Sequence, residues 1–268
     1  MSLEEFTLQL PRNAFGPRDA ARAGDLWRAF QDAAILGSSR RGWPPSRYRD
    51  EACAFVVRAM TAVHHRETRF GEPLAARTWI STFKRGVMSD RQVRLSAVGG
   101  GLVAAATQRW VHVRLPDLKP VRASADLERC FGVLAPEGEG DVRLPAFAPI
   151  EGGAGHTFAF DAWHTWMDPH AHANHPAYVD WADEAVSRMI AARGADPQRL
   201  APVAEEVAWR SGVLAPERVT VASRLVGRTE AGHAVLGHTF TGGDGRLCAE
   251  ATTVRALADG DLLDLLGG

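Results

Sequence analysis

A short polar segment in the second half of the chain carries side chains that could perform acid–base or nucleophilic chemistry. Asp168, His170, His172 and Asn174 fall within seven consecutive residues. A carboxylate can attack an electrophilic carbon or take a proton from water, and an imidazole can orient the carboxylate or help to move the proton. An amide side chain can position water or donate a hydrogen bond to a substrate. This segment is the candidate catalytic site.

The same residues also fit structural roles. Asp168 stands before Pro169, and an Asp-Pro pair commonly initiates a turn. Asn174 could cap a following helix, with Pro176 in the first helical turn. From the residues alone, turn statistics favour the structural role for Asp168.

Histidines crowd this segment, which suggests a metal site as another alternative. His170 and His172 would point the same way in an extended chain, and Asp168 and His175 are close to them in sequence. No Cys or His motif with the spacing of a zinc site occurs elsewhere in the sequence. We therefore expect no metal ligands and no cofactor.

A long helix is predicted directly after the polar segment, over residues 176–192. Pro176 suits its first turn, and Gly194 suits its end. Its apolar face would contain Tyr178, Trp181, Ala182, Ala185 and Met189. The candidate substrate contacts of this region are His175, Tyr178, Trp181 and Glu184. The two aromatic residues also suit a buried core or pocket wall, and the acid also suits a solvent-exposed helix face.

The two halves of the chain show the same order of elements. A helix predicted over residues 23–36 aligns with the later helix at an offset of 152 residues, and stretches of alternating polar and apolar residues follow each helix. A turn with an acid, at Glu72 and at Glu217, precedes a strand in each half at an offset of 145 residues. Residues 141–145 and 156–163 could add strands to the second half. We predict an α+β fold made by a tandem repeat, in which each half is a long helix with an antiparallel sheet.

This repeat divides the chain into a first domain, a linker and a second domain, at residues 1–125, 126–150 and 151–268. The linker is assigned because the segment is dense in Gly, Pro and charged residues. At the offset of 152, Asp168 aligns with Gly16, His172 with Ala20, and Asn174 with Arg22. We therefore expect one site per chain, with the first domain as a scaffold.

The composition argues against several functional classes. The 31 basic and 32 acidic residues leave no positive excess for binding nucleic acid. No apolar stretch is long enough to span a membrane, and the first residues do not resemble a signal peptide. The cysteines, Cys53, Cys130 and Cys248, are too few and too widely spaced for a disulfide framework. We expect a cytoplasmic protein without nucleic-acid or membrane partners.

The segment over residues 166–184, WMDPHAHANHPAYVDWADE, resembles hot-dog thioesterases. Its Asp-Pro pair followed by Tyr178 and Trp181 is similar to the 4-hydroxybenzoyl-CoA thioesterase group. Its Asp168, His172 and Asn174 resemble residues of the fatty acyl-ACP thioesterases. The runs FGPRDAARAGDLWRAFQDAA and FVVRAMTAVHHRETRFGEPLAARTWISTF resemble the N-terminal half of the acyl-ACP enzymes. The resemblance covers nearly the whole chain and implies a tandem (double) hot-dog fold.

This resemblance implies hydrolysis of an acyl-ACP or acyl-CoA thioester, with Asp168 as the nucleophile or general base. His170 and His172 would orient the carboxylate or assist proton transfer. The N-terminus of the 176–192 helix would hold the carbonyl oxygen as negative charge develops. Because single-domain hot-dog proteins form such a pair by dimerising, we expect a monomeric pseudo-dimer or a homodimer.

Two departures from the family pattern leave other functions open. The acyl-ACP enzymes have an Asn where this chain has His170, and a Glu or Cys on the following strand where Val213 and Leu214 align here. A hydratase or dehydratase of acyl thioesters is one alternative, because such enzymes also place an Asp and a His at a hot-dog interface. A protein that binds acyl thioesters without catalysis is the other.

Overall fold

The computed structural model describes residues 3–267, and the chain separates into two units. Unit 1 contains residues 3–14 and 26–143, and unit 2 contains residues 15–25 and 144–267. The division between residues 143 and 144 falls inside the segment predicted as a linker.

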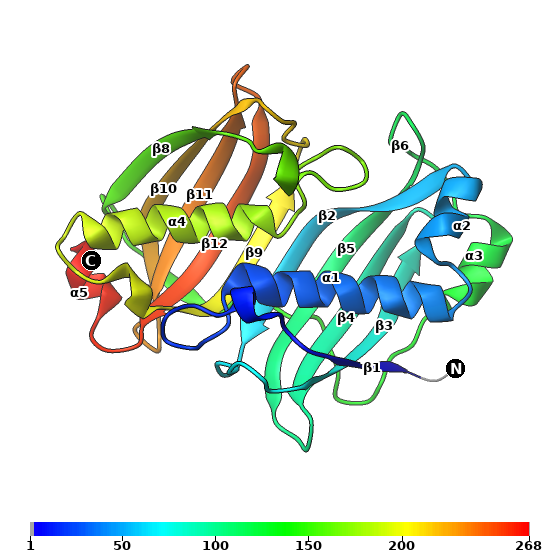
Figure 1. Cartoon of the computed structure of the whole chain (residues 1–268), viewed down its shortest axis with the longest axis horizontal. Coiled ribbons are helices and arrows are strands. Elements are labelled where there is room, and N and C mark those ends of the chain that lie inside the picture. The colour runs from blue at the N-terminus through cyan, green and yellow to red at the C-terminus, as the bar shows by residue number, and fades with distance from the viewer. Residues whose placement is uncertain (1–2, 268) are drawn as a thin grey trace. The chain divides into compact units, whose positions relative to one another are not determined.

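Unit 1 is an antiparallel sheet with the long helix α1 (Ala23–Arg40) along one face (Figure 1). Its strands lie in the order β1–β3–β4–β5–β2, and the short β6 pairs with β5. The strands are β1 (Glu4–Leu8), β2 (Cys53–His64), β3 (Leu74–Lys84), β4 (Met88–Ala97), β5 (Leu102–Arg114) and β6 (Lys119–Pro120). The short helices are η1 (Arg12–Ala14), α2 (Pro45–Asp50) and α3 (Ala125–Cys130).

Unit 2 repeats this plan with helix α4 (Ala177–Ala191) on one face of its sheet. Its strands lie in the order β9–β12–β11–β10, and both β7 and β8 pair with β10. They are β7 (Phe147–Pro149), β8 (Gly155–Asp161), β9 (Leu200–Trp209), β10 (Arg218–Thr229), β11 (Ala234–Gly242) and β12 (Leu247–Leu257). The other helices are η2 (His164–Trp166), η3 (Pro197–Arg199) and α5 (Leu262–Leu266).

Helix α4 begins and ends where its sequence signals predict. Pro176 is its N-terminal cap residue, with φ −65°, a backbone angle that the proline ring favours. Gly194 has φ +76°, and the N–H groups of Gly194 and Ala195 donate to the carbonyls of Ala191 and Ile190. These two bonds form a Schellman motif, which gives hydrogen-bond donors to carbonyls that have no partner within the helix.

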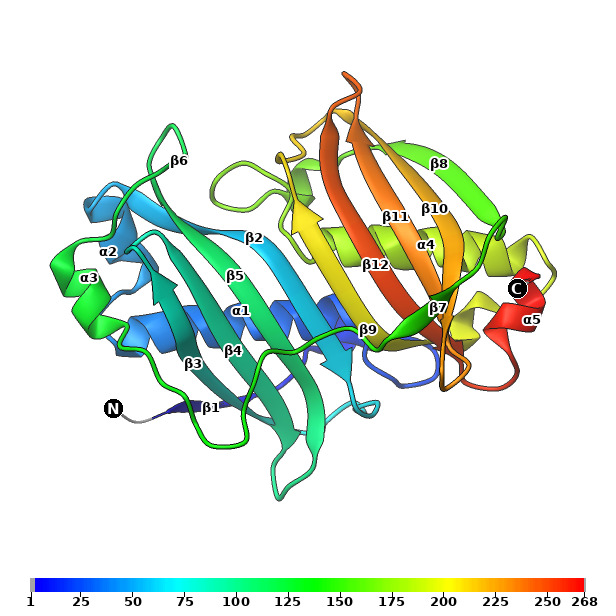
Figure 2. The same ribbon diagram turned by 180° about the vertical axis from the view of Figure 1, so that it is seen from behind.

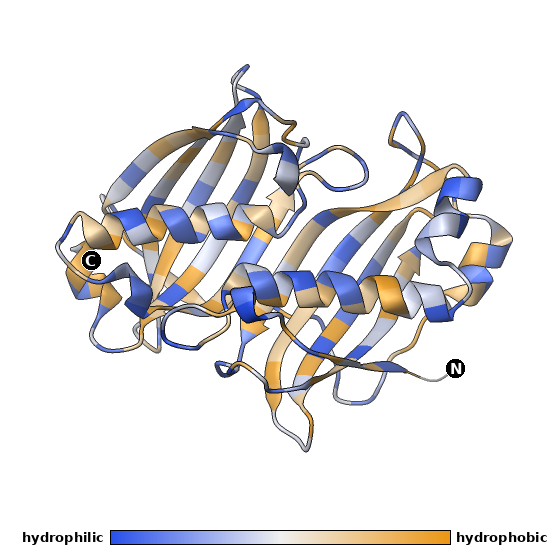
Figure 3. Cartoon of the chain, in the orientation of Figure 1, coloured by the Kyte–Doolittle hydropathy of each residue, from blue (hydrophilic) through white to orange (hydrophobic). Residues whose placement is uncertain are grey.

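Each sheet has one face against its helix and an opposite, outer face, which is seen in Figure 2. On β10, Val219, Val221 and Leu225 are buried, whereas the alternating Ala222 and Arg224 are exposed. The alternation appears in Figure 3 as hydrophobic and hydrophilic bands along the strands. Burial of the apolar rows against the helix supplies the main driving force for this arrangement.

The backbone reproduces the predicted repeat in detail. The isolated bridge Phe15↔Ala21 and the bridge Met167↔Ala173 are 152 residues apart, and so are Asp19 and Ala171, whose φ values are +58° and +60°. Corresponding residues of the strands in the two halves are instead 145 residues apart. The predicted α+β fold with a helix and an antiparallel sheet in each half is confirmed.

Several local predictions differ from the structure. Helix α1 runs to Arg40, four residues beyond its predicted end. Residues 141–145 form no strand, and the strand that pairs with β10 instead covers Phe147–Pro149. Residues 125–130 fold as helix α3, and its Leu127 is fully buried with Trp43 and Phe131. The composition predicts a linker here because Gly, Pro and charged residues surround this short helix.

No helix within residues 3–267 combines the length and the apolar character needed to cross a membrane.

Candidate active site

The polar segment forms a tight loop between η2 and α4. The backbone N–H of Asp168 donates to the carbonyl of His172 at 2.7 Å, and the N–H of Ala171 donates to the carbonyl of Asp168 at 2.9 Å. Ala171 adopts a left-handed conformation, which costs a non-glycine residue about 1 kcal/mol. Asp168, His170 and His172 are thereby brought into one loop.

One oxygen of the Asp168 carboxylate is fixed within this loop. Its Oδ1 accepts the N–H of His170 at 2.8 Å and, more weakly, the N–H of His172 at 3.4 Å. The side chain is only partly buried. The carboxylate therefore has a defined direction while remaining accessible.

A second segment, residues 211–214, which follows β9 after Arg210, holds this loop in place. The carbonyl of Val213 accepts the N–H of Ala173 at 2.8 Å, and the N–H of Val213 donates to the Tyr178 hydroxyl at 3.3 Å. Gly212 packs directly against the His172 ring. A Cβ added at Gly212 would be only 2.3 Å from the ring atom Cδ2 and would clash with it. The position of His172 therefore depends on the absence of a side chain at residue 212.

His172 also borders an open groove of about 500 Å³. The groove is lined by His172, Gly212, Leu214, Ala215, Pro216, Glu217, Asp244 and Arg246. Glu217 Oε1 accepts hydrogen bonds from Arg246 and from the N–H of Leu214, both at 2.6 Å, and the Glu217 hydrogen bond raises the pKa of Arg246. The groove beside His172 thus combines the charged side chains of Glu217, Asp244 and Arg246 with an apolar wall of Leu214, Ala215 and Pro216.

The N-terminus of α4 lies immediately after the loop, but its first N–H groups already have acceptors. Ala177 and Val179 donate to the carbonyls of Asn174 and Pro176 at 2.9 and 3.0 Å, and Tyr178 donates to His175 at 3.4 Å. The positive end of the helix dipole remains near the loop. A substrate oxygen there would experience this field, but it would have to share these donors.

The candidate substrate contacts occupy very different places. Tyr178 and Trp181 are 1% and 4% exposed, with ring centroids 4.7 Å apart, and burial raises the pKa of the Tyr178 phenol. His175 is buried edge-on against Trp209, at 5.6 Å between ring centroids. Glu184 lies on the exposed face of α4 in an ion pair with Arg188. The aromatic residues support the loop from within the core, whereas Glu184 points away from it.

Val213 and Leu214, which align with the Glu or Cys of the family pattern, lie in the segment after β9. Val213 is fully buried, and Leu214 is 47% exposed. The acids earlier on β9 are not at the loop: the Glu205 carboxylate is 2.5 Å from buried Arg255, and Glu206 is on the outer face of the sheet. Two acids share the groove with His172, Asp244 and Glu217, and the sequence marked Glu217 only as part of a turn.

Within residues 3–267, no group of three or more His, Cys, Asp or Glu side chains is arranged to hold a metal ion.

The first half contains the same loop without the carboxylate. Gly16 donates its N–H to the carbonyl of Ala20 at 3.0 Å, and Asp19 donates to Gly16 at 2.9 Å, as Asp168 and Ala171 do in the second loop. The loop therefore closes with Gly16 where the other copy has Asp168. Backbone hydrogen bonds are sufficient to form this turn, and its carboxylate is not required.

The helix, the sheet and this duplicated loop define a tandem hot-dog protein. Residues 162–262, which include the candidate site, match the family model of the thioesterase-like superfamily. The predicted resemblance to hot-dog thioesterases is confirmed. A search of curated proteins found no match.

Three solved structures are similar over nearly the whole chain. The chain is 16% identical to a protein named as an oleoyl thioesterase from Lactobacillus plantarum, with a TM-score of 0.80 over 97% of this chain and 98% of that one. An acyl-ACP thioesterase from Bacteroides thetaiotaomicron gives 12% identity and a TM-score of 0.73 over 94% and 97%. The 12:0-ACP thioesterase from Umbellularia californica gives 14% and 0.74 over 95% and 94%. At these identities the likeness establishes the tandem hot-dog fold.

Proposed function

We propose that this protein hydrolyses an acyl-ACP or acyl-CoA thioester to the free acid and the thiol, with Asp168 as the catalytic carboxylate. The duplicated loop carries this proposal. Because the loop of Gly16 forms the same turn, the turn does not account for the carboxylate of Asp168. The match of residues 162–262 to the thioesterase-like superfamily supports a hydrolytic role for that carboxylate.

Either of two routes gives the same products. As a general base, Asp168 takes a proton from water while the water oxygen bonds to the thioester carbon, and the C–S bond then breaks. As a nucleophile, Asp168 bonds to that carbon and releases the thiolate, and water hydrolyses the resulting anhydride. In both routes the thiolate takes up a proton. His172, on the groove side of the loop, is suited to supply it.

The carbonyl oxygen needs hydrogen-bond donors as negative charge develops on it. We assign this role to the Asn174 side-chain amide together with the field of the α4 N-terminus, because the N–H groups of Ala177 and Val179 already donate to carbonyls. Tyr178 and Trp181 act as supports for the loop, and Glu184 has no part in the reaction.

The test is a panel of acyl-CoA and acyl-ACP thioesters of different chain lengths, with detection of the free thiol. A protein blank corrects for the free cysteines Cys53, Cys130 and Cys248. We expect turnover of at least one class, and a loss of at least about 100-fold in kcat for Asp168→Asn. The matched control is Asp161→Asn, which changes an exposed acid at the end of β8 and should retain native activity.

Circular dichroism should show both variants folded, because Asn retains an oxygen that can accept the N–H of His170. Native turnover in Asp168→Asn would remove Asp168 from the mechanism. The buried, apolar Val213 at a position where the family has a Glu or Cys favours one alternative, a non-catalytic acyl-thioester binding protein. Tight binding of acyl-CoA without turnover over hours would support that alternative and overturn hydrolysis.

A further inference from the structure

The segment of residues 211–214 is held in place by the side chain of Arg246. The Nη2 of this arginine donates to the carbonyl of Gly212 at 2.9 Å and to Oε1 of Glu217 at 2.6 Å. The same carboxylate oxygen accepts the N–H of Leu214 at 2.6 Å. The guanidinium and the carboxylate together therefore fix the backbone on both sides of Val213.

This segment in turn sets the position of His172. The backbone of Gly212 is so close to the ring that an added Cβ would be 2.3 Å from Cδ2 and 2.7 Å from Cγ. The carbonyl of Val213 accepts the N–H of Ala173, the residue that follows His172, at 2.8 Å. A shift of the segment would therefore move the ring or the backbone beside it.

The first half shows that the turn at this acid forms without a cation from another hairpin. Glu72 and Glu217 are 145 residues apart, and each carboxylate accepts the N–H of the residue three positions earlier. These donors are Arg69 at 3.4 Å and Leu214 at 2.6 Å. Glu72 pairs with Arg66, which lies in its own turn. In the second half the cation comes instead from the hairpin between β11 and β12.

That hairpin differs from its counterpart in the first half at two linked positions. The N–H of Gly242 donates to the carbonyl of Arg246 at 3.0 Å. In the first half Ala97 donates to Gly101 at 3.0 Å, so Gly101 holds the place of Arg246. A Cβ on Gly242 would be 2.6 Å from Nη1 of Arg246 and 3.1 Å from Oε2 of Glu217. The second half therefore has an arginine where the first has glycine, and glycine where that arginine needs space.

We propose that Arg246 is a positioning residue for His172, acting through the backbone of Gly212. This inference rests on the proposed function, in which His172 supplies the proton to the leaving thiolate. The duplicated turn forms in the first half with Gly101 at the corresponding position, so folding of the turn does not require the arginine. The copy of the loop that carries Asp168 is also the copy that carries this cross-link.

Two variants perturb this cross-link in different ways. Arg246→Met removes the guanidinium, but it also leaves Glu217 and Asp244 beside His172 without their cation. Gly242→Ala displaces the guanidinium while every charge stays in the chain, so it separates an effect of position from an effect of charge. It should fold, because alanine occupies the corresponding position of the first half.

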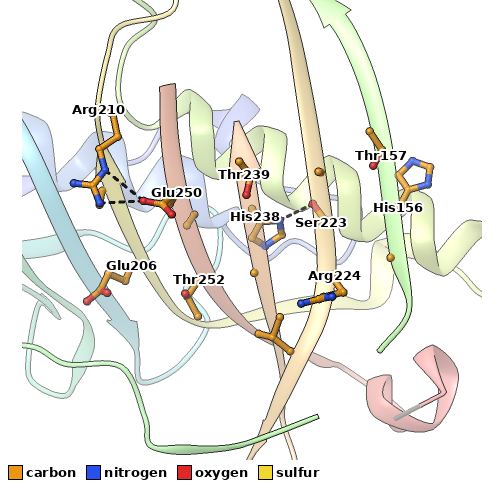
Figure 4. A pocket seen from close by; sticks show the side chains of 16 residues that line it. His156, Thr157, Glu206, Arg210, Ser223, Arg224, His238, Thr239, Glu250 and Thr252 are labelled. Carbon is orange, nitrogen blue, oxygen red and sulfur yellow. Dashed lines mark hydrogen bonds and ion pairs between the residues drawn. The ribbon is translucent and has the colours of Figure 1, made fainter. Parts of the chain in front are cut away.

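Both variants should lower kcat for an acyl thioester about tenfold or more, with KM changed less than about twofold. The matched control is Arg210→Met, which should retain native kcat. Arg210 directly precedes the segment, but its side chain pairs with Glu250 at 3.0 Å on the outer face of the sheet (Figure 4). Native kcat in both test variants would overturn the proposal, as would a rise in KM alone, which would indicate substrate binding.

A double-mutant cycle tests whether Arg246 acts through His172. In a chain that carries His172→Ala, adding Arg246→Met should change kcat less than about twofold, because the ring that the arginine positions is already absent. A general defect in folding would lower kcat by the same factor with and without the imidazole. Equal losses in the two backgrounds would therefore overturn the proposal.

A proton–carbon NMR spectrum gives a readout that needs no turnover. The Cδ2–H signal of His172, assigned by its loss in His172→Ala, should shift in Arg246→Met and in Gly242→Ala but not in Arg210→Met. An unchanged signal in both test variants would overturn the proposal whether or not a thioester is hydrolysed. If the native chain hydrolyses no thioester while the signal shifts, the proposed function fails and the dependence of the ring position on Arg246 stands.

Discussion

His238 gives unit 2 a defined dependence of stability on pH. The imidazole lies inside the sheet–helix core, where its Nδ1 and Nε2 are 2.7 and 2.8 Å from the hydroxyls of Ser223 and Thr253. Burial, and then the charge of Arg255, lower the pKa of His238 from 6.5 to about 3. The folded protein therefore keeps this imidazole neutral over the range in which an exposed histidine becomes charged.

The sign and size of the effect follow from this difference. Below pH 6.5 the unfolded chain binds a proton at His238 and the folded chain does not, so acid stabilises the unfolded state. Each pH unit between 6.5 and about 3 then costs about 1.36 kcal/mol. Between pH 7.5 and pH 5.0, His238 should remove about 2 kcal/mol from the free energy of unfolding.

Urea unfolding at these two pH values, for the native chain and for His238→Gln, measures this contribution. Glutamine cannot titrate but retains a donor and an acceptor, and its fixed cost cancels when each protein is compared with itself. The native chain should lose about 2 kcal/mol more than the variant on acidification. Equal losses in the two proteins would refute the reasoning, as would an NMR titration in which the His238 ring becomes protonated near pH 6.

Two further predictions concern buried and closely packed positions. Glu205→Ala should lower the free energy of unfolding by about 3 kcal/mol in urea titrations, because Arg255 is fully buried and loses a carboxylate partner, whereas Glu250→Ala, in an exposed ion pair, should cost less than about 1 kcal/mol. If these two variants are equally stable, burial does not set the strength of the pair. Gly212→Ala should displace the His172 ring and, under the proposed function, reduce kcat about tenfold or more with little change in melting temperature. Native kcat in that variant would show that the position of His172 is unimportant.

The repeat was predictable because local patterns specify it. The helices follow from apolar residues at helical spacing, and the strands follow from alternation. The change of offset from 152 in the loops to 145 in the strands also has a simple origin. Helix α1 has 18 residues and α4 has 15, and the connection to the next strand covers residues 41–52 in the first half but only 192–199 in the second. Short helix α2 occupies this longer connection.

The fixed position of residues 139–142 could not be predicted, because it depends on contacts between residues distant in sequence. The segment that includes residues 139–142 has the composition of a linker, and its order comes from Arg77, Arg94 and Thr107 on three strands. The role of Gly212 was equally hidden. A glycine after a strand usually marks a turn, and only the position of the His172 ring shows why no side chain fits there.

The candidate site depends on side chains that the repeat itself does not determine. Both loops close through the same backbone bonds and place one residue in the left-handed region, Asp19 in the first and Ala171 in the second. A sequence that only had to form this turn could have glycine at both position 16 and position 168, since glycine leaves the backbone hydrogen bonds intact. The presence of Asp168 in one copy alone therefore calls for a reason outside the folding of the loop. Chemistry at an accessible, oriented carboxylate is such a reason, and it applies to only one of the two loops.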